Sequence, residues 1–166
     1  MITIRHETTT DHAAIRAVVA AAFGQDAEAD LVDGLRADGD LVLSLVATDG
    51  DDIVGHIAFS RAWIDRVGQR FAAVALAPMS VHPGRQRQGI GGRLIAEAHR
   101  RLAASGERLS VVVGHPDYYP RFGYAHALAE AFTTPYQGEA LMACAFGKAP
   151  REGTLRFPAA FERMDD

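Results

Sequence analysis

The chain has 166 residues, 48% of them apolar and 23% charged, which is the balance of a soluble globular protein with enough length for one substantial core. Its formal charge of −4 excludes the overall basic field that draws a protein to nucleic acid or to an anionic membrane. Cys144 is the only cysteine, so an intrachain disulfide framework is excluded and a reducing compartment is favoured.

The ends and the apolar runs give no sign of export or of a membrane span. The segment Met1–Glu7 is too short and too polar for a signal peptide. No apolar run approaches the roughly 18–20 residues that cross a bilayer. We therefore expect one cytoplasmic domain over residues 1–166, with residues 147–166 as a C-terminal extension.

Apolar periodicity in the first 70 residues predicts strands and helices in alternation. Ile2, Ile4 and His6 alternate with polar residues, as in a half-buried strand. Gly55 lies within a strand pattern, which predicts a bulge or a close approach of another element. The expected elements are a strand over 2–7, helices over 11–23 and 26–38, and strands over 41–48 and 53–64 joined by a hairpin turn at 49–52.

The second half begins with an apolar run, residues 71–81, that is interrupted by Pro78. Proline cannot donate to a sheet ladder, so this strand should be bulged or splayed there. The remaining expected elements are a helix over 90–104, strands over 108–114, 132–134 and 141–146, and a tail over 147–166 that wraps the surface. The pattern indicates a mixed α/β or α+β domain with an antiparallel first half.

A glycine-rich loop joins the strand over 71–81 to the helix over 90–104. Its glycines are at 84, 89, 91 and 92, and arginines lie at 85, 87 and 93. A strand that enters such a loop and continues as a helix places unpaired backbone N–H groups at a positive dipole end. This arrangement predicts a site for a phosphate or pyrophosphate.

Spacing separates three kinds of phosphate loop. A P-loop needs Lys and Ser or Thr where this chain has Ile90 and Gly91, so nucleotide hydrolysis is excluded. A dinucleotide fingerprint needs a third glycine where Leu94 stands, and it needs a parallel βαβ unit. The third pattern, Gln or Arg followed by x-x-Gly-x-Gly or Ala, is matched in full by Gln86–Gly91.

With this motif the chain resembles the GNAT superfamily of N-acetyltransferases. A second segment, Gly114–Tyr124, carries a tyrosine four residues before a Gly-aromatic pair, and it is similar to a bacterial branch of acetyltransferases, as is Leu76–Pro83. The resemblance covers roughly Ile2 to Phe146. It implies a mostly antiparallel central sheet of about six to seven strands, splayed at the fourth strand and flanked by helices on both faces.

The resemblance implies a cosubstrate, acetyl-CoA, and an acceptor, a primary amine of an unidentified small molecule or peptide, with direct transfer in a ternary complex. Backbone groups of the bulged strand would hold the pantetheine and acetyl units, and the loop would hold the pyrophosphate. The expected cofactor-binding residues are Met79, Ser80, Val81, Arg85, Gln86, Arg87, Gln88, Gly89, Ile90, Gly91, Gly92 and Arg93.

Tyr119 aligns with the residue that often acts as general acid in the superfamily, protonating the departing thiolate. Tyr118 should point elsewhere, because adjacent helical residues do not share a face. For the general base, His115 at the end of a strand, Glu28 in the second helix and a water chain all stay open. His82 would at most bridge phosphate or water. We expect no metal, since no pair of His or Cys has ligand spacing.

One alternative function remains open, a non-catalytic acyl-CoA-binding or regulatory module with the same fold. Transfer of a longer acyl group is a variant of the enzymatic hypothesis. Dimers are common in the superfamily, so a homodimer stays open too, and no acceptor can be identified from the sequence.

Overall fold

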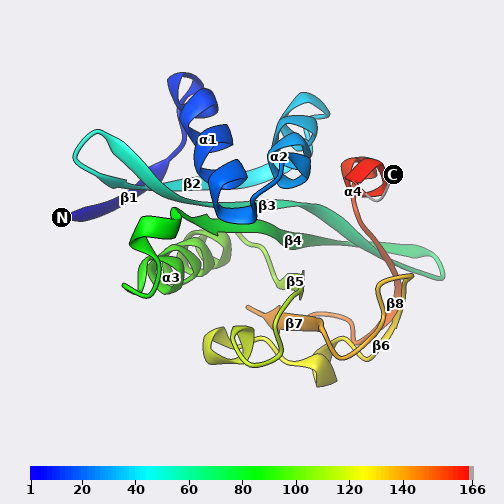
Figure 1. Ribbon diagram of the computed structural model, residues 1–166. Helices are drawn as coiled ribbons and strands as arrows, with labels where there is room; N and C mark the ends of the chain where they lie inside the picture. The colour runs from blue at the N-terminus through cyan, green and yellow to red at the C-terminus, as the bar shows by residue number, and fades with distance from the viewer. Residues whose placement is uncertain (165–166) are drawn as a thin grey trace.

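The computed structural model describes residues 1–164 and shows one mixed sheet of eight strands with helices on both faces (Figure 1). The strands are β1 (Ile2–His6), β2 (Leu41–Asp49), β3 (Asp52–Arg66), β4 (Gln69–Val81), β5 (Leu109–Val113), β6 (Ala131–Thr133), β7 (Leu141–Ala145) and β8 (Glu152–Arg156). The helices are α1 (His12–Phe23), α2 (Ala27–Ala37), α3 (Ile90–Ala104) and α4 (Ala159–Met164), with short 3-10 turns η1 (Thr9–Asp11), η2 (Pro83–Arg85), η3 (Tyr119–Phe122) and η4 (His126–Leu128).

The main path through the sheet runs β1-β2-β3-β4-β5-β7, and β8 pairs with β3 and β6. Neighbouring strands are antiparallel except for β4 with β5 and β6 with β8. Helices α1 and α2 lie on one face of the sheet and α3 lies on the other (Figure 1). None of the helices in residues 1–164 is long and apolar enough to cross a membrane.

The predicted interruption at Pro78 is confirmed. In the β3–β4 ladder Ile57 pairs with Met79 and Phe59 pairs with Leu76, so one residue of β3 faces two residues of β4, Ala77 and Pro78. On its other edge β4 pairs with β5 only at Val74–Ser110 and Ala75–Val111. Beyond that point the two strands no longer share a ladder, and the sheet is open between them.

Gly55 is both a bulge and a close-approach point, as its place in the strand pattern predicts. The β2–β3 register shifts beside it, between Ala47 and Thr48. A Cβ on Gly55 would lie 3.1 Å from Ile90 Cγ2 and 3.2 Å from Leu94 Cδ1. The first turn of α3 therefore rests directly on β3, which holds the N-terminus of α3 at the end of β4.

The expectation that residues 147–166 wrap the surface is wrong for the part of the tail that the structure describes. Leu155 of β8 and Ala160 and Phe161 of α4 are buried, and they pack in one cluster with Leu31 and Leu35 of α2. The tail thus adds an eighth strand to the six or seven expected. A five-residue strand and a six-residue helix contain too few periods for an apolar pattern to show in sequence.

A chain of polar contacts that starts at a buried histidine ties β2, β3 and α2 to Glu7, the residue after β1. His56 is completely buried in β3, and its Nε2 lies 2.8 Å from Ser44 Oγ. Ser44 in turn donates a hydrogen bond to Glu7, whose carboxylate accepts from Arg36 Nη2 at 2.9 Å. Burial lowers the pKa of His56 from 6.5 to about 4, although the Glu7 carboxylate opposes part of the shift.

This arrangement predicts an acid-sensitive fold. Between pH 6.5 and 4 the unfolded chain binds a proton at His56 and the folded chain does not, so the free energy of unfolding should fall as the pH drops through that interval. Protonation of His56 alone should lower the free energy of unfolding by on the order of 2–3 kcal/mol over this interval. Urea unfolding at a series of pH values measures this loss of stability. The His56→Gln variant has no side chain that titrates at this position, so its free energy of unfolding should fall less over the same interval. Equal pH slopes in the two proteins would contradict this.

Candidate active site

A cavity of about 970 Å³ opens where the pairing of β4 with β5 ends. Its walls come from six places: the end of α1, the start of α2, the second half of β4, the glycine-rich loop with the start of α3, the end of β5 with the segment that follows it, and the last described residue of α4. The lining residues are Ala22, Phe23, Glu28, Leu31, Leu76–Val81, Arg85–Arg87, Gly89–Gly92, Val112–His115, Tyr118, Tyr119, Arg121 and Met164.

Most of the residues expected from sequence to bind a cofactor share this cavity. The exceptions are Gln88 and Arg93, which do not line it. Arg93 Nη2 instead donates to the carbonyl oxygen of Ile2 at 3.1 Å. Because α3 rises from the loop, a side chain at position 93 already points back to β1 and away from the cavity.

The loop has the backbone geometry of an anion site. Gly89 caps α3 with φ 80°, and Arg87 has φ 63°. The first helical hydrogen bond runs from the N–H of Arg93 to the carbonyl of Gly89, at 3.1 Å. The N–H groups of Ile90, Gly91 and Gly92 therefore precede the intrahelical ladder and are available at the positive end of the helix dipole.

Gly89 and Gly91 are glycines for different structural reasons. At Gly89 a Cβ would meet nothing within 4 Å, so its positive φ is what favours glycine. At Gly91 a Cβ would lie 3.0 Å from Tyr118 Oη and 3.2 Å from Met79 Cε. Gly91 thus allows the wall of the cavity, Met79 and Tyr118, to pack against the first turn of α3.

The three arginines near the loop differ in whether their side chains already form hydrogen bonds or ion pairs within the protein. Arg85 Nη1 forms an ion pair with Asp49 at 3.0 Å, and Arg93 is bound to Ile2 as above. Within residues 1–164 the Arg87 side chain has no hydrogen bond or ion pair. Arg87 is therefore the arginine of the loop that is freest to pair with an anion.

Tyr119 lies deep in the wall formed by β5 and η3. Its ring packs so closely on Gly114 that a Cβ there would lie 2.3 Å from Tyr119 Cε2. The ring also meets Tyr124 edge to face at 5.8 Å between centroids. Burial raises the pKa of Tyr119 to about 12, so its phenol holds its proton at neutral pH.

The expectation that Tyr118 points away is wrong. Tyr118 lines the cavity beside Tyr119, with ring centroids 5.2 Å apart, and its hydroxyl reaches the start of α3. The helical-face argument fails because Tyr118 is the residue before η3 (φ −101°, ψ −55°) and is not part of a regular helix. The two hydroxyls are therefore both candidates for contact with a bound molecule.

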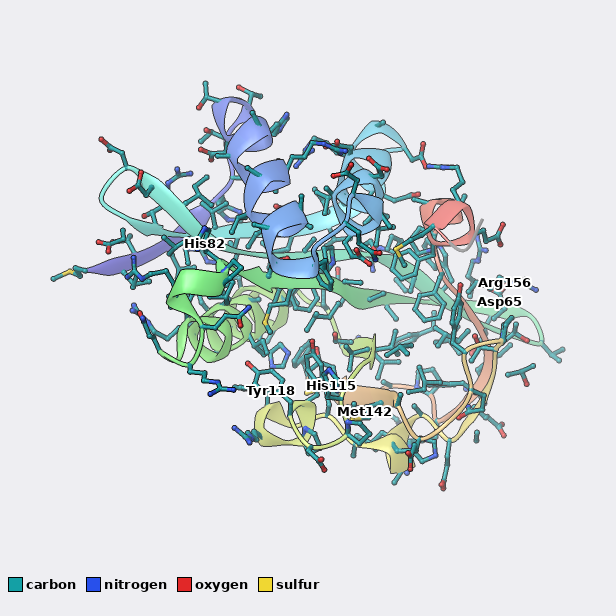
Figure 2. The ribbon with its side chains drawn as sticks, in the orientation of Figure 1. Asp65, His82, His115, Tyr118, Met142 and Arg156 are labelled. Atoms are coloured by element: carbon teal, nitrogen blue, oxygen red, sulfur yellow. The ribbon has the colours of Figure 1, made fainter. Side chains whose placement is uncertain are left out.

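The two candidate bases line the cavity from different walls. Glu28 lies in the first turn of α2, where Gln25 Nε2 donates to both carboxylate oxygens at 2.9 and 3.1 Å. His115 follows β5, and Figure 2 shows it beside Tyr118. Its carbonyl oxygen accepts a hydrogen bond from the N–H of Tyr118. His82 does not line the cavity: its Nδ1 accepts from the N–H of Gly84 at 3.0 Å, which is a capping role in η2.

Several lining residues were not expected from sequence. Phe23, Leu31 and Val113 belong to apolar patterns that predict core positions, and Met164 lies in the tail. No local signal distinguishes such residues from core residues, because only the arrangement of α1, α2, β5 and α4 in space turns them toward a common opening.

The comparisons with known proteins agree with this geometry. A family model described as an acetyltransferase (GNAT) domain matches residues 3–127. The uncharacterized N-acetyltransferase YhbS of Escherichia coli K12 is 38% identical over 122 residues, 73% of this chain and 72% of the relative. The uncharacterized N-acetyltransferase YjhQ of the same strain is 36% identical over 143 residues, 81% and 79% of the two chains.

Two solved structures are similar over nearly the whole length. A GNAT family acetyltransferase from Brucella melitensis, in complex with acetyl-CoA, has a TM-score of 0.83 and 38% identity, covering 97% of this chain and 98% of that one. Escherichia coli YhbS in complex with CoA has a TM-score of 0.87 and 32% identity, covering 98% and 92%. The glycine-rich loop and the open β4–β5 edge agree with these matches. The chain therefore belongs to the GNAT family of acetyltransferases.

Proposed function

We propose that this protein transfers the acetyl group of acetyl-CoA directly to a primary amine in a ternary complex. The observation that carries the proposal is that one cavity joins three parts: the N–H groups at the start of α3, the end of β4 whose β5 edge has no partner, and the Tyr119 phenol. A pyrophosphate, a thioester and a departing thiolate need these three environments. The acetyl-CoA and CoA complexes of the two structural relatives support the same cofactor.

The pyrophosphate would bind at the loop. The backbone N–H groups of residues 89–92 would donate to its oxygens, and Arg87 would pair with its charge. Arg85, Gln86 and Ile90 line the same part of the cavity, whereas Gln88 and Arg93 would contribute at most from outside it. The cavity thus offers both hydrogen-bond donors and positive charge where a diphosphate needs them.

The thioester would bind along the end of β4. Because β4 has no partner on its β5 side beyond Ala75, the backbone groups of Met79, Ser80 and Val81 on that edge are not used by a β5 ladder. An N–H in this segment would donate to the carbonyl oxygen of the thioester and stabilise the charge that develops there when the amine attacks. The carbon–sulfur bond then breaks and the sulfur leaves as a thiolate.

Tyr119 would protonate that thiolate. Its pKa of about 12 is higher than that of an ordinary thiol, near 8.5, so the transfer is unfavourable at equilibrium and depends on local positioning. The rigid packing of the ring on Gly114 supplies that positioning. Before the attack, the acceptor ammonium would lose a proton to Glu28, His115 or water and become a neutral amine. Single substitutions at Glu28 and His115, compared by pH–rate profile, would distinguish these routes.

Binding of acetyl-CoA should depend on the backbone at Gly89. In Gly89→Glu the side chain must adopt a positive φ and adds negative charge at the loop, so calorimetric titration should show affinity for acetyl-CoA weaker by on the order of 100-fold. Gly68→Glu is the matched control, because Gly68 also has a positive φ (72°) and open space around it but lies in the β3–β4 turn. No binding of acetyl-CoA to the unaltered protein at millimolar concentration would overturn the proposal.

Turnover should depend on the Tyr119 hydroxyl. Tyr119→Phe keeps the ring packing and removes the proton donor, so CoA release with a reactive amine should slow by about 100-fold with little change in acetyl-CoA affinity. Tyr118→Phe removes the neighbouring hydroxyl of the same cavity, and a smaller loss there than in Tyr119→Phe would assign the proton donor to Tyr119. Unchanged turnover in Tyr119→Phe would exclude it as the acid. Tight acetyl-CoA binding with no CoA release for any amine would instead indicate a non-catalytic acyl-CoA-binding module.

A further inference from the structure

Large apolar side chains are exposed around the mouth of the cavity. Among residues 1–164 the large hydrophobic residues with the greatest exposure include Phe23 (43%), Val113 (48%) and Met164 (38%), and all three line the cavity. Met1 and Val67 are also exposed, but neither of them lines the cavity. Single exposed apolar residues are ordinary, but several that gather at one opening indicate a contact surface.

Phe23, Val113 and Met164 form an apolar rim at the mouth of the cavity, and this rim lies on the face of the sheet that α2 covers. Leu31 of α2 and Val111 of β5 pack in the same buried cluster, and Val113, two residues further along the strand, points to that same face. Leu31 and Met164 also line a small pocket between α2 and α4. Figure 1 shows α1, α2 and α4 on the side of the sheet opposite α3. The apolar rim and the glycine-rich loop are therefore on opposite sides of the β4–β5 opening.

One carboxylate interrupts this apolar wall. Glu28 precedes Leu31 by three residues, so the two lie on the same side of α2. The cations that line the cavity are elsewhere: Arg85 and Arg87 belong to the loop, and the Arg121 guanidinium lies over the Tyr118 ring, 5.7 Å from its centroid. Among the described residues that line the cavity, Glu28 is thus the one carboxylate, and it shares the α1, α2 and α4 side with the apolar residues Phe23, Leu31 and Met164.

We infer that the acceptor is a primary amine with an apolar body, such as an alkylamine or an arylalkylamine, and that α4 of the C-terminal tail forms part of its site. The inference rests on the proposed function and names its substrate class. The Glu28 carboxylate meets the one ammonium group, and Phe23, Leu31 and Met164 cover the hydrocarbon. A polycation or an aminoglycoside would place further charged or hydroxyl groups against this wall without partners, which is costly.

The balance of the reaction is that of the proposed transfer. The ammonium first gives one proton to Glu28, His115 or water. The amine nitrogen then forms a bond to the acetyl carbon, the carbon–sulfur bond breaks, the nitrogen loses its second proton, and the sulfur gains one from Tyr119. The apolar body takes no part in these steps, so its contribution is to binding. It should therefore appear in kcat/KM as a dependence on hydrocarbon size.

The test is a series of acceptors at saturating acetyl-CoA, with CoA release as the readout. For propylamine, butylamine, pentylamine and hexylamine, kcat/KM should rise about two- to fourfold with each methylene, and 2-phenylethylamine should exceed spermidine and an aminoglycoside. Turnover with spermidine or the aminoglycoside but not with the alkylamines would overturn the inference and leave the proposed function standing. No CoA release with any amine, despite acetyl-CoA binding, would overturn the proposed function and the inference with it.

Substitutions in the apolar rim test whether this rim forms the acceptor site. Met164→Ser and Phe23→Ser alter exposed side chains, so folding should be retained, and each should raise KM for hexylamine about fivefold to tenfold while KM for acetyl-CoA is unchanged. Val67→Ser is the matched control, an exposed apolar residue outside the cavity, and should change neither. If both rim variants keep the hexylamine KM of the unaltered protein, the apolar wall is not the acceptor site and the inference fails.

Discussion

Pro78 imposes the constraint on which the rest of the site depends. It lies inside a long apolar strand but has no N–H to donate, so β4 is bulged against β3 at this point. On the other edge, pairing with β5 ends at Ala75, a few residues earlier. A continuous sheet would fill this place with backbone hydrogen bonds. The interrupted sheet has a cavity there instead, with the backbone of Met79–Val81 along one side.

The two faces of the sheet give the two ends of the cavity different chemistry. On one face, the contact of Gly55 with Ile90 and Leu94 holds the N-terminus of α3 at the end of β4, where its N–H groups and Arg87 suit an anion. On the other face, α1, α2 and α4 contribute apolar side chains and the carboxylate of Glu28. An end suited to an anion and a largely apolar end therefore meet at the opening, where we propose that the reacting atoms lie.

The parts of this site that follow local rules could be predicted from sequence. The bounds of α3, the bulge at Pro78 and the glycine-rich loop that begins α3 depend on a few adjacent residues whose backbone chemistry is specific. The position of Tyr118 could not be predicted, because it depends on where an irregular segment ends and η3 begins. The apolar side of the cavity, which we propose binds the acceptor, could not be predicted either. Its residues are ordinary apolar positions until four separate elements pack together, and Met164 comes from a tail too short to show periodicity.

We expect acetyl-CoA in the β4–β5 opening, with its pyrophosphate on the start of α3. A crystal structure of the complex with acetyl-CoA would show whether it lies there. Phosphate oxygens should lie within hydrogen-bond distance of the N–H groups of residues 89–92, and the thioester sulfur should lie near the Tyr119 hydroxyl with the acetyl group directed toward Glu28. A cofactor bound outside the opening, or one whose thioester lies away from both β4 and Tyr119, would contradict this expectation.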